Sequence, residues 1–316
     1  MLRAAGDPTR LRLLLLLRQA ELTVSELVEI VGQSQPRVSR HLKLLGEAGL
    51  VERFKEGSWV FCRAADRGTG AELGAAIAAL ADPSSQESDK ARLAHVRQAR
   101  AAAAAAYFKA NAAEWERIRA LHAPERDVEE AIARHLTSRP IDNFLDAGTG
   151  TGRMLELIAP HAKRAVGIDV SPDMLAIARD RLLNGNLRNA QVRLADTYRL
   201  PFASGTAATG FDVVLFHQVL HYLDDPGAAV AEAARVMAPG GRLLIADFAP
   251  HREEFLRDEF AHRRLGFSDR EVESWFAAAG LSHAGSETIA PQGEGEKLTV
   301  KLWLATQKAK SKKEAA

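Results

Sequence analysis

The stretch that decides the fold is NFLDAGTGTGR, residues 143–153. An apolar run typical of a buried β-strand leads into Gly148, Gly150 and Gly152, and a helical pattern follows. Glycines here let the backbone approach a ligand where a Cβ would collide. A dinucleotide-binding loop has the spacing G-x-G-x-x-G and would need glycine at position 153, which is Arg153. The spacing G-x-G-x-G therefore disfavours a nicotinamide site but keeps the strand–turn–helix context of a nucleotide site.

Polar residues end the next two predicted strands. In AVGIDVSPDML (165–175) the strand ends at Asp169, where a carboxylate can accept hydrogen bonds from both ribose hydroxyls. In VRLADTYRLPF (192–202) the strand ends at Ala195 and Asp196, which are placed to bind an exocyclic amine. The fourth strand, within FDVVLFHQVLHYL (211–223), ends at the same edge. These positions together favour a nucleoside-containing ligand.

From Ile141 onward the chain alternates predicted strands with helices. The early strands are continuous apolar runs, typical of a parallel sheet covered on both faces. The sequence therefore predicts an α/β, Rossmann-like domain. Its seven strands are expected near 143–147, 165–169, 191–195, 211–216, 241–247, 283–288 and 298–305.

Together with ARVMAPGGRLLIADF (234–248), these motifs resemble class I methyltransferases that depend on S-adenosylmethionine (SAM), over about residues 103–306. The resemblance implies a seven-stranded sheet whose last strand is antiparallel, and SAM or S-adenosylhomocysteine as the ligand. The ligand contacts that it implies are Asp146, Gly148, Gly150 and Gly152 around the methionine part, Asp169 at the ribose, Met174, Ala195 and Asp196 at the adenine, and His217 beside the sulfonium. The alternative is a doubly wound domain with an empty site.

Methyl transfer needs a general base only if the acceptor must lose a proton. The candidates are His217, His221 and Tyr222, with Arg263 or Arg264 as further polar groups. The alternative for His221 and Tyr222 is a helix cap packed at the sheet edge. A second set, His251, Glu254, Asp258 and His262, falls along one predicted helix face, where a solvated acid–base surface is favoured over a metal site. The acceptor is not identified by any motif.

The amino-terminal part has a different pattern. Thr23 and Glu26 form a predicted capping box that opens a helix through about Val31. Ser34 is a predicted N-cap with Pro36 in the first turn of a second helix, which stops at Gly49. LVERFKEGSWVFCRA (50–64) then has the pattern of a hairpin. Helix–turn–helix followed by a hairpin predicts a winged helix.

The second of these helices has the two faces of a DNA-recognition helix. Its aliphatic face carries Val38, Leu42 and Leu45. Its outer face carries Gln35, Arg37, Ser39, Arg40 and Lys43. Gln and Arg can contact base edges, whereas Lys suits phosphate. The alternative is an ordinary solvated helix face. Residues 1–66 hold ten Arg or Lys and eight Asp or Glu, so operator binding would depend on the placement of charge.

The segments GDPTRLRLLLLL and ELTVSELVEIVGQSQPRVSRHLKLLGEAGLV, with the hairpin after them, resemble ArsR-type winged-helix repressors over about residues 1–66. The resemblance implies a homodimer that binds double-stranded operator DNA and releases it when a ligand binds. Two positions that carry metal-binding cysteines in many of these repressors are Thr23 and Ser25, and hydroxyls are poor ligands for soft metals. Cys62, the one cysteine, is expected to be a small buried residue. No metal is therefore expected.

The chain has 316 residues and a net charge of +1, with 47% hydrophobic and 26% charged residues. This composition is typical of a globular protein with two domains. The longest early apolar run is too short for a signal peptide or a membrane span, so a cytoplasmic protein without a membrane partner is expected. The expected divisions are 1–82 for the DNA-binding and dimerisation domain, 83–102 for a connector, 103–306 for the methyltransferase-like domain and 307–316 for a disordered basic tail.

Two functions remain open at this point. One is a transcriptional regulator whose carboxy-terminal domain binds SAM or S-adenosylhomocysteine as its signal. The other is an active methyltransferase of an unidentified small molecule, with the winged helix as an accessory DNA-binding domain.

Overall fold

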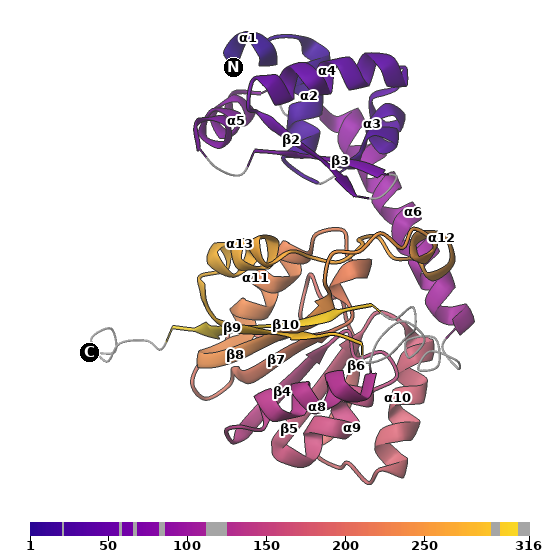
Figure 1. Ribbon diagram of the computed structural model, residues 1–316, viewed down its shortest axis with the longest axis vertical. Coiled ribbons are helices and arrows are strands. Elements are labelled where there is room, and N and C mark those ends of the chain that lie inside the picture. The colour runs from indigo at the N-terminus through magenta and orange to yellow at the C-terminus, as the bar shows by residue number, and fades with distance from the viewer. Residues whose placement is uncertain are drawn as a thin grey trace. The chain divides into compact units, whose positions relative to one another are not determined.

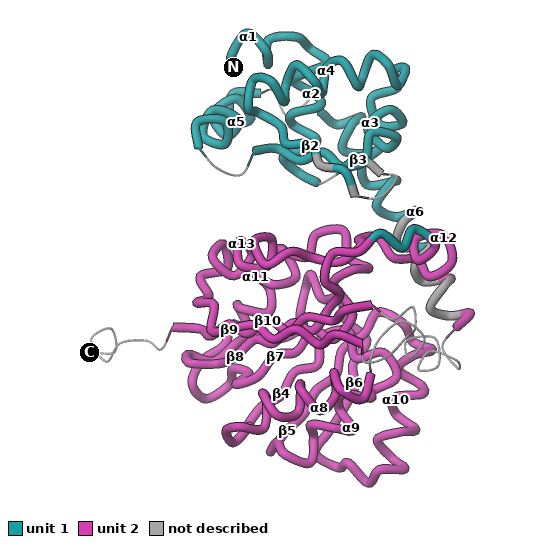
Figure 2. The backbone as a smooth tube through the Cα atoms, viewed as in Figure 1, with its two compact units in different colours: residues 1–103, 252–254 teal, residues 104–251, 255–316 magenta. Residues whose placement is uncertain are grey.

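The computed structural model describes residues 1–20, 22–56, 59–65, 68–81, 86–111, 125–291 and 298–308. The chain divides into two compact units, residues 1–103 with 252–254 and residues 104–251 with 255–316 (Figure 2). The described helices include none that is both long and apolar enough to cross a bilayer. Part of the expected connector and most of the expected basic tail lie outside the described residues. The domain limits given above stay predictions.

The first unit has the predicted winged-helix order, with helices before a small sheet (Figure 1). Its sheet has the strand order β1-β3-β2, and all pairs are antiparallel. The elements are α1 (Leu2–Ala5), α2 (Pro8–Leu17), β1 (Leu22–Thr23), α3 (Val24–Val31), α4 (Gln35–Glu47), β2 (Val51–Glu56), β3 (Trp59–Ala64), α5 (Gly68–Leu80) and α6 (Glu87–Asn111).

The predicted capping box at α3 is confirmed. The Thr23 hydroxyl accepts a hydrogen bond from the Glu26 amide at 3.3 Å, and the Thr23 amide donates to the Glu26 carboxylate at 2.7 Å. Two backbone donors at the start of the helix are thereby satisfied. Ser34 precedes α4 as expected, but its side chain makes no capping hydrogen bond. Pro36 in the first turn has no amide hydrogen to satisfy, which suits it to that place.

The aliphatic faces of α2, α3 and α4 form one core with the first half of α6. Leu93 and Val96 of α6 are buried in this core. The Asp89 carboxylate, also buried, accepts two hydrogen bonds from the Arg12 guanidinium, at 2.7 and 2.6 Å. This ion pair raises the pKa of Arg12. The amino-terminal half of α6 is therefore an integral part of the winged-helix unit.

The second unit contains one seven-stranded sheet in the order β6-β5-β4-β7-β8-β10-β9. The five neighbouring strands β6, β5, β4, β7 and β8 pair in parallel, and β10 is antiparallel to both of its neighbours, β8 and β9. All seven predicted strands and the antiparallel last strand are confirmed. The strands are β4 (Ile141–Ala147), β5 (Ala162–Asp169), β6 (Ala190–Leu194), β7 (Phe211–His217), β8 (Met237–Phe248), β9 (Leu281–Ile289) and β10 (Val300–Gln307).

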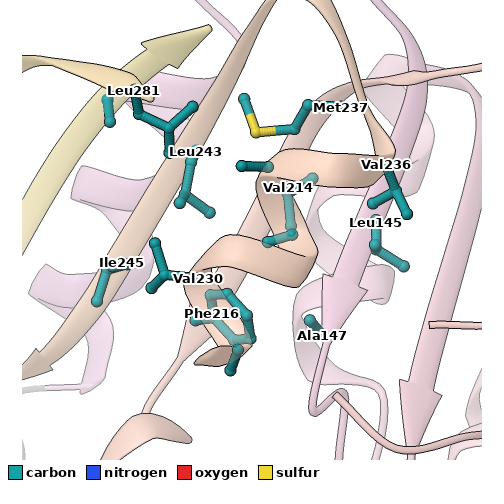
Figure 3. Packing of buried hydrophobic residues seen from close by; sticks show 14 of the residues in the cluster. Leu145, Ala147, Val214, Phe216, Val230, Val236, Met237, Leu243, Ile245 and Leu281 are labelled. Atoms are coloured by element: carbon teal, nitrogen blue, oxygen red, sulfur yellow. The ribbon is translucent and has the colours of Figure 1, made fainter. Parts of the chain in front are cut away.

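Helices cover both faces of the sheet, as the continuous apolar strands predict (Figure 1). Alternate strand residues belong to opposite cores: Leu145 and Val214 pack with α11 and α13, whereas Phe144 and Val213 pack with α8 and α9. Figure 3 shows part of the first core, with Leu145, Val214 and Val230 among its aliphatic side chains. The helices are α8 (Glu125–Leu136), α9 (Arg153–Ile158), η3 (Ala159–His161), α10 (Pro172–Asn184), η4 (Leu220–Tyr222), α11 (Pro226–Val236), α12 (Phe255–Phe260) and α13 (Asp269–Ala278).

The segment that follows β8 differs from its prediction. Because α12 covers only residues 255–260, His251 and His262 lie outside it, and the four expected residues do not share one helix face. His262 is buried rather than solvated. Apolar and aromatic neighbours, which helical spacing cannot reveal, decide this placement. The described residues contain no group of three or more His, Cys, Asp or Glu that could hold a metal ion.

Candidate functional site

The sheet has a topological switch point between β4 and β7. From β4 the chain continues outward through β5 and β6, and it then returns to β7 on the other side of β4. The connections that leave the carboxyl ends of β4 and β7 therefore run in opposite directions and leave a crevice between them, where doubly wound domains bind ligands. In this chain the crevice is flanked by the glycine turn after β4 and by the turn from residue 217 to residue 222 after β7.

The glycine turn has a defined backbone conformation. Gly148, Gly150 and Gly152 have φ angles of 82°, 52° and 82°, in the left-handed region that favours glycine. The amides of Gly148 and Thr149 both donate to the carbonyl of Ile168 in β5, at 2.9 and 2.7 Å. The turn is thus held against the neighbouring strand.

Asp146 has a supporting position in this turn. Its carboxylate is buried and accepts a hydrogen bond from the Thr149 hydroxyl at 2.6 Å. A Cβ built on Gly148 would lie 2.5 Å from Val219 Cγ2, so the two turns on either side of the crevice are in direct contact. Gly148 is therefore needed for packing within the protein itself, and not only for the approach of a ligand.

Asp169 ends β5 beside the glycine turn, as predicted. One carboxylate oxygen accepts from the Gly150 amide at 2.9 Å, and the other accepts from the Ser171 amide at 2.8 Å. The side chain is half-buried, and its burial raises the pKa of Asp169 despite these hydrogen bonds. Ser171 in turn caps α10 by accepting from the Met174 amide. The carboxylate is thus held rigidly, with both oxygens fixed by backbone donors.

The surface next to Asp169 is apolar and open. Val170 and Leu194, at the ends of β5 and β6, are 57% and 60% exposed. The backbone of Leu194 pairs with that of Asp169, so the apolar residues and the carboxylate are neighbours across the sheet edge. Exposed aliphatic side chains beside a fixed carboxylate suit a ligand with a flat apolar ring and a hydroxylated sugar. The sequence did not single out either residue.

The three residues expected at the adenine differ in their exposure. Asp196 is exposed, and its Oδ1 accepts from the Tyr198 amide, which leaves Oδ2 available to an amine. Ala195 is half-buried and its amide donates to the carbonyl of Asp169. Met174 is buried, which makes it a packing residue of α10 in this structure. The structure thus brings Asp146, the glycines, Asp169 and residues 195–196 to one edge of the sheet.

The turn after β7 carries the catalytic candidates. His217 is buried at the end of β7, and the residue after it, Gln218, has a φ of 53°, a strained value for a residue that is not glycine. His221 lies in η4, and its Nδ1 is 2.7 Å from the Oδ1 of Asp247 at the end of β8. Both side chains are almost completely buried. The carboxylate partner of His221 was not foreseen from the sequence.

Asp247 is the residue that sequence reasoning missed. A signal was available, since LLIAD (243–247) is a buried apolar run that ends in a carboxylate. Its carboxyl end lies at the same sheet edge as His217, because β7 and β8 are parallel neighbours. A polar residue at the carboxyl end of a parallel strand is the pattern that identified Asp169.

Several positive side chains surround η4. The amides of Arg263 and Arg264 donate to the carbonyl of His221, at 2.9 and 3.0 Å. Both arginines are buried, and they form ion pairs with Asp224 at 2.7 Å and Glu271 at 3.1 Å. The guanidinium charges are therefore compensated within the protein.

The recognition helix α4 has the expected faces. Val38, Leu42 and Leu45 are buried. Gln35, Arg37, Arg40 and Lys43 are exposed and Ser39 is half-buried, on the polar face. A polar face on a helix that packs on its other side into the core is free to enter a major groove.

The observed geometry defines a class of protein: a winged helix joined to a doubly wound α/β domain. The family description "Bacterial regulatory protein, arsR family" matches residues 7–53, and the description "Methyltransferase domain" matches residues 145–245. The chain therefore combines an ArsR-family helix–turn–helix with a class I methyltransferase domain of the SAM-dependent fold.

Curated relatives match the second unit. The demethylmenaquinone methyltransferase of Thermus thermophilus is 39% identical over 111 residues, 34% of this chain and 47% of that protein. The ubiquinone/menaquinone biosynthesis C-methyltransferase UbiE of Teredinibacter turnerae is 34% identical over 129 residues, 39% of this chain and 49% of that protein. The matches thus span about half the length of these two relatives.

A solved structure shares the fold. One chain of the complex between the Haloferax volcanii Trm112 methyltransferase activator and a methyltransferase superimposes with a TM-score of 0.56 and 20% identity, over 66% of this chain and 99% of that chain. This likeness supports the methyltransferase fold.

Proposed function

We infer that the protein is a DNA-binding regulator whose methyltransferase domain binds SAM or S-adenosylhomocysteine as its signal. The observation that carries this proposal is the position of Asp169, held by the amides of Gly150 and Ser171 at the edge of the crevice. A carboxylate held in this way suits the acceptance of hydrogen bonds from ribose hydroxyls. The winged helix supplies the second half of the proposal, since its exposed polar helix face suits operator DNA.

Each part of the ligand has residues that fit it. Residues 148–152 would surround the methionine part, Asp169 would accept the ribose hydroxyls, and the exposed apolar surface of Val170 and Leu194 would cover the adenine beside residues 195–196. His217 would lie toward the sulfonium end. Asp146 would act through the Thr149 hydroxyl that it holds. When bound, SAM supplies an electrophilic methyl group on its sulfonium.

The donor chemistry of the amino-terminal unit supports a signal that is not a soft metal. The Thr23 hydroxyl caps α3 and Cys62 is completely buried in the core. A capping hydroxyl and a buried thiol in a hydrophobic core are unsuited to capture a thiophilic ion. The input is therefore proposed to enter through the second unit.

A signal ligand must prefer one of the two states, DNA-bound or DNA-free. Calorimetry of the full chain with SAM and with S-adenosylhomocysteine tests binding, and fluorescence anisotropy of an operator fragment tests coupling. Asp169→Ala is expected to abolish ligand binding, while Asp180→Ala, an exposed carboxylate on α10, leaves it unchanged. Operator affinity that does not change at saturating ligand would overturn the signalling proposal. A homodimer is proposed from the ArsR resemblance, and light scattering of the full chain measures it.

Active methyl transfer is the second candidate function. The observation that favours it is the buried His221–Asp247 pair, because a histidine held by a carboxylate is a frequent arrangement for proton transfer. Relatives of the second unit are named as methyltransferases, which supports the same proposal. Labelled SAM with a panel of acceptors measures turnover. Tight S-adenosylhomocysteine binding with no turnover on any acceptor would leave the regulator as the function.

A further inference from the structure

The buried pair formed by His221 and Asp247 has a fixed arrangement of protons. Asp247 Oδ1 accepts from the Phe248 amide at 2.8 Å and lies 2.7 Å from His221 Nδ1, and its Oδ2 accepts from the Leu220 amide at 3.0 Å. A carboxylate that already accepts two amide hydrogens acts as an acceptor toward the imidazole as well. His221 therefore carries its proton on Nδ1, which leaves a lone pair on Nε2.

That lone pair has no hydrogen-bond donor among the described residues. His221 Nε2 is buried and has no hydrogen-bond partner among the residues that the structure describes. Such an acceptor is costly in a protein interior, so a partner from outside the chain is expected. Around the imidazole lie the rings of Tyr222, His262 and Phe248, with centroids at 4.1, 4.2 and 5.0 Å. The surroundings favour a flat apolar partner with one hydroxyl donor.

The pair also lies beside the crevice. Val219, two residues before His221, occupies the space that a Cβ of Gly148 would need. The backbone of Leu220, between them, is bound to Asp247. The turn that carries His221 is thus clamped between the glycine turn and β8. This is the side of the crevice toward which the sulfonium of SAM is expected to point.

We propose that His221 is the general base for a methyl acceptor with an acidic hydroxyl, of the phenol or enol class, and that Asp247 is its positioning residue. This inference rests on the second of the proposed functions. The acceptor hydroxyl gives its proton to Nε2, and its oxygen, or the conjugated carbon, forms a bond to the methyl carbon. The carbon–sulfur bond of SAM breaks, and its electron pair stays on sulfur as S-adenosylhomocysteine. The imidazolium charge is balanced by Asp247.

The acidity of the hydroxyl decides the class of acceptor. A phenol has a pKa of about 10, close enough to that of imidazole at about 6.5 for direct proton transfer, whereas an aliphatic alcohol is far weaker as an acid. The charged and titratable groups that face His221 are Asp247 from β8, Tyr222 from η4, and His262, Arg263 and Arg264 from the segment after α12. Because the arginine charges are compensated, Asp247 is the group that offsets a proton on His221.

4-Nitrophenol is a suitable probe, because its phenolate absorbs in the visible range and its phenol does not. The full chain, saturated with S-adenosylhomocysteine, is titrated with it. The wild type is expected to bind the probe and to increase its phenolate absorbance. His221→Gln should weaken binding by about 10- to 100-fold, as expected for loss of a charge-assisted hydrogen bond. The matched control is His283→Gln, a surface histidine whose Nδ1 also faces a carboxylate, that of Glu273 at 3.3 Å.

Turnover of 4-nitrophenol with labelled SAM gives the second readout. His221→Gln should lower kcat by about 10²- to 10⁴-fold with little change in the KM for SAM. Asp247→Asn should also lower kcat and should shift the ¹⁵N signals of His221 toward the other tautomer, a change that a purely structural role would not produce.

The outcomes separate the two proposals. If the wild type fails to bind S-adenosylhomocysteine, the proposed function itself is wrong. If it binds S-adenosylhomocysteine but not the probe, or if His221→Gln behaves like the control, the assignment of His221 is overturned. Circular dichroism shows whether His221→Gln folds. If it does not fold, the kinetics of Asp247→Asn and the ¹⁵N signals of wild-type His221 decide the question. A wild-type tautomer that carries its proton on Nε2 refutes the proposal.

Discussion

Gly148 offers a direct test of how the crevice is built. In Gly148→Ala the new Cβ would lie 2.5 and 2.7 Å from the two γ-carbons of Val219 and 3.2 Å from its Cβ. Rotation about χ1 of Val219 would move its two γ-carbons, but its Cβ would stay at 3.2 Å, so rotation alone relieves only part of the contact. The φ of 82° adds strain for any residue with a Cβ. We expect about 1–2 kcal/mol from the left-handed backbone and about 1–3 kcal/mol from overpacking.

The expected total is thus a loss of about 2–5 kcal/mol in the stability of the ligand-free second unit. Hydrogen exchange of peptides from β4 and β7 in the full chain measures it. The partner variant Val219→Ala should cost about 1–2 kcal/mol because a half-buried side chain loses two methyl groups. In the double variant the overpacking disappears and the backbone strain remains.

A double-mutant cycle therefore predicts a coupling of about 1–3 kcal/mol between positions 148 and 219. If Gly148 made no packing contact with Val219, Gly148→Ala would cost the ligand-free protein only the backbone strain of about 1–2 kcal/mol, and Val219→Ala would rescue nothing. Additive effects of the two substitutions would refute the packing argument. Calorimetry with S-adenosylhomocysteine on the same variants then isolates the effect on binding.

Three other perturbations test separate parts of the chain. Asp89→Asn leaves the half-buried Arg12 without its ion-pair partner and should destabilise the winged-helix unit by about 1–3 kcal/mol, measured by urea unfolding. This cost is smaller than that of breaking a fully buried ion pair, because the Arg12 side chain is 33% exposed. Burial raises the pKa of Asp169, and hydrogen bonds from the ribose hydroxyls need the ionised carboxylate. The affinity for SAM, measured by calorimetry, should therefore fall as the pH drops through that raised pKa. An affinity that stays unchanged into the acid range contradicts the assignment of Asp169 to the ribose. Lys43→Ala should weaken binding to all DNA sequences alike and reduce the salt dependence of binding, whereas Arg40→Ala should relax the sequence preference in a selection from random DNA. Identical effects of the two variants would contradict the assignment of Lys43 to phosphate and Arg40 to base edges.

The local sequence was sufficient for much of the architecture. Apolar runs and glycine spacing predicted all seven strands and the strand–turn–helix at residues 143–153, because these features depend on neighbours along the chain. The capping box of Thr23 and Glu26 was equally local. Asp169 was located because a parallel strand delivers the residue at its carboxyl end to one edge of the sheet.

Other features required residues that are distant in the chain. The contact of Gly148 with Val219, the pairing of Asp89 with Arg12 and the pairing of His221 with Asp247 depend on which strands and helices become neighbours. The helical periodicity around residues 251–262 suggested a polar face, but the helix ends at Phe260, and His262 is buried against the rings of His221 and Tyr222.

The sequence by itself thus determined the two domain types, the order of their elements and the position of Asp169 at the end of β5. The tertiary structure decided which polar groups meet. Periodicity places a side chain on a face of its own element, whereas hydrogen-bond partners are set by sheet order and by the close packing of turns at the switch point. For this reason the pairing of His221 with Asp247 became visible only when β7 and β8 lay side by side.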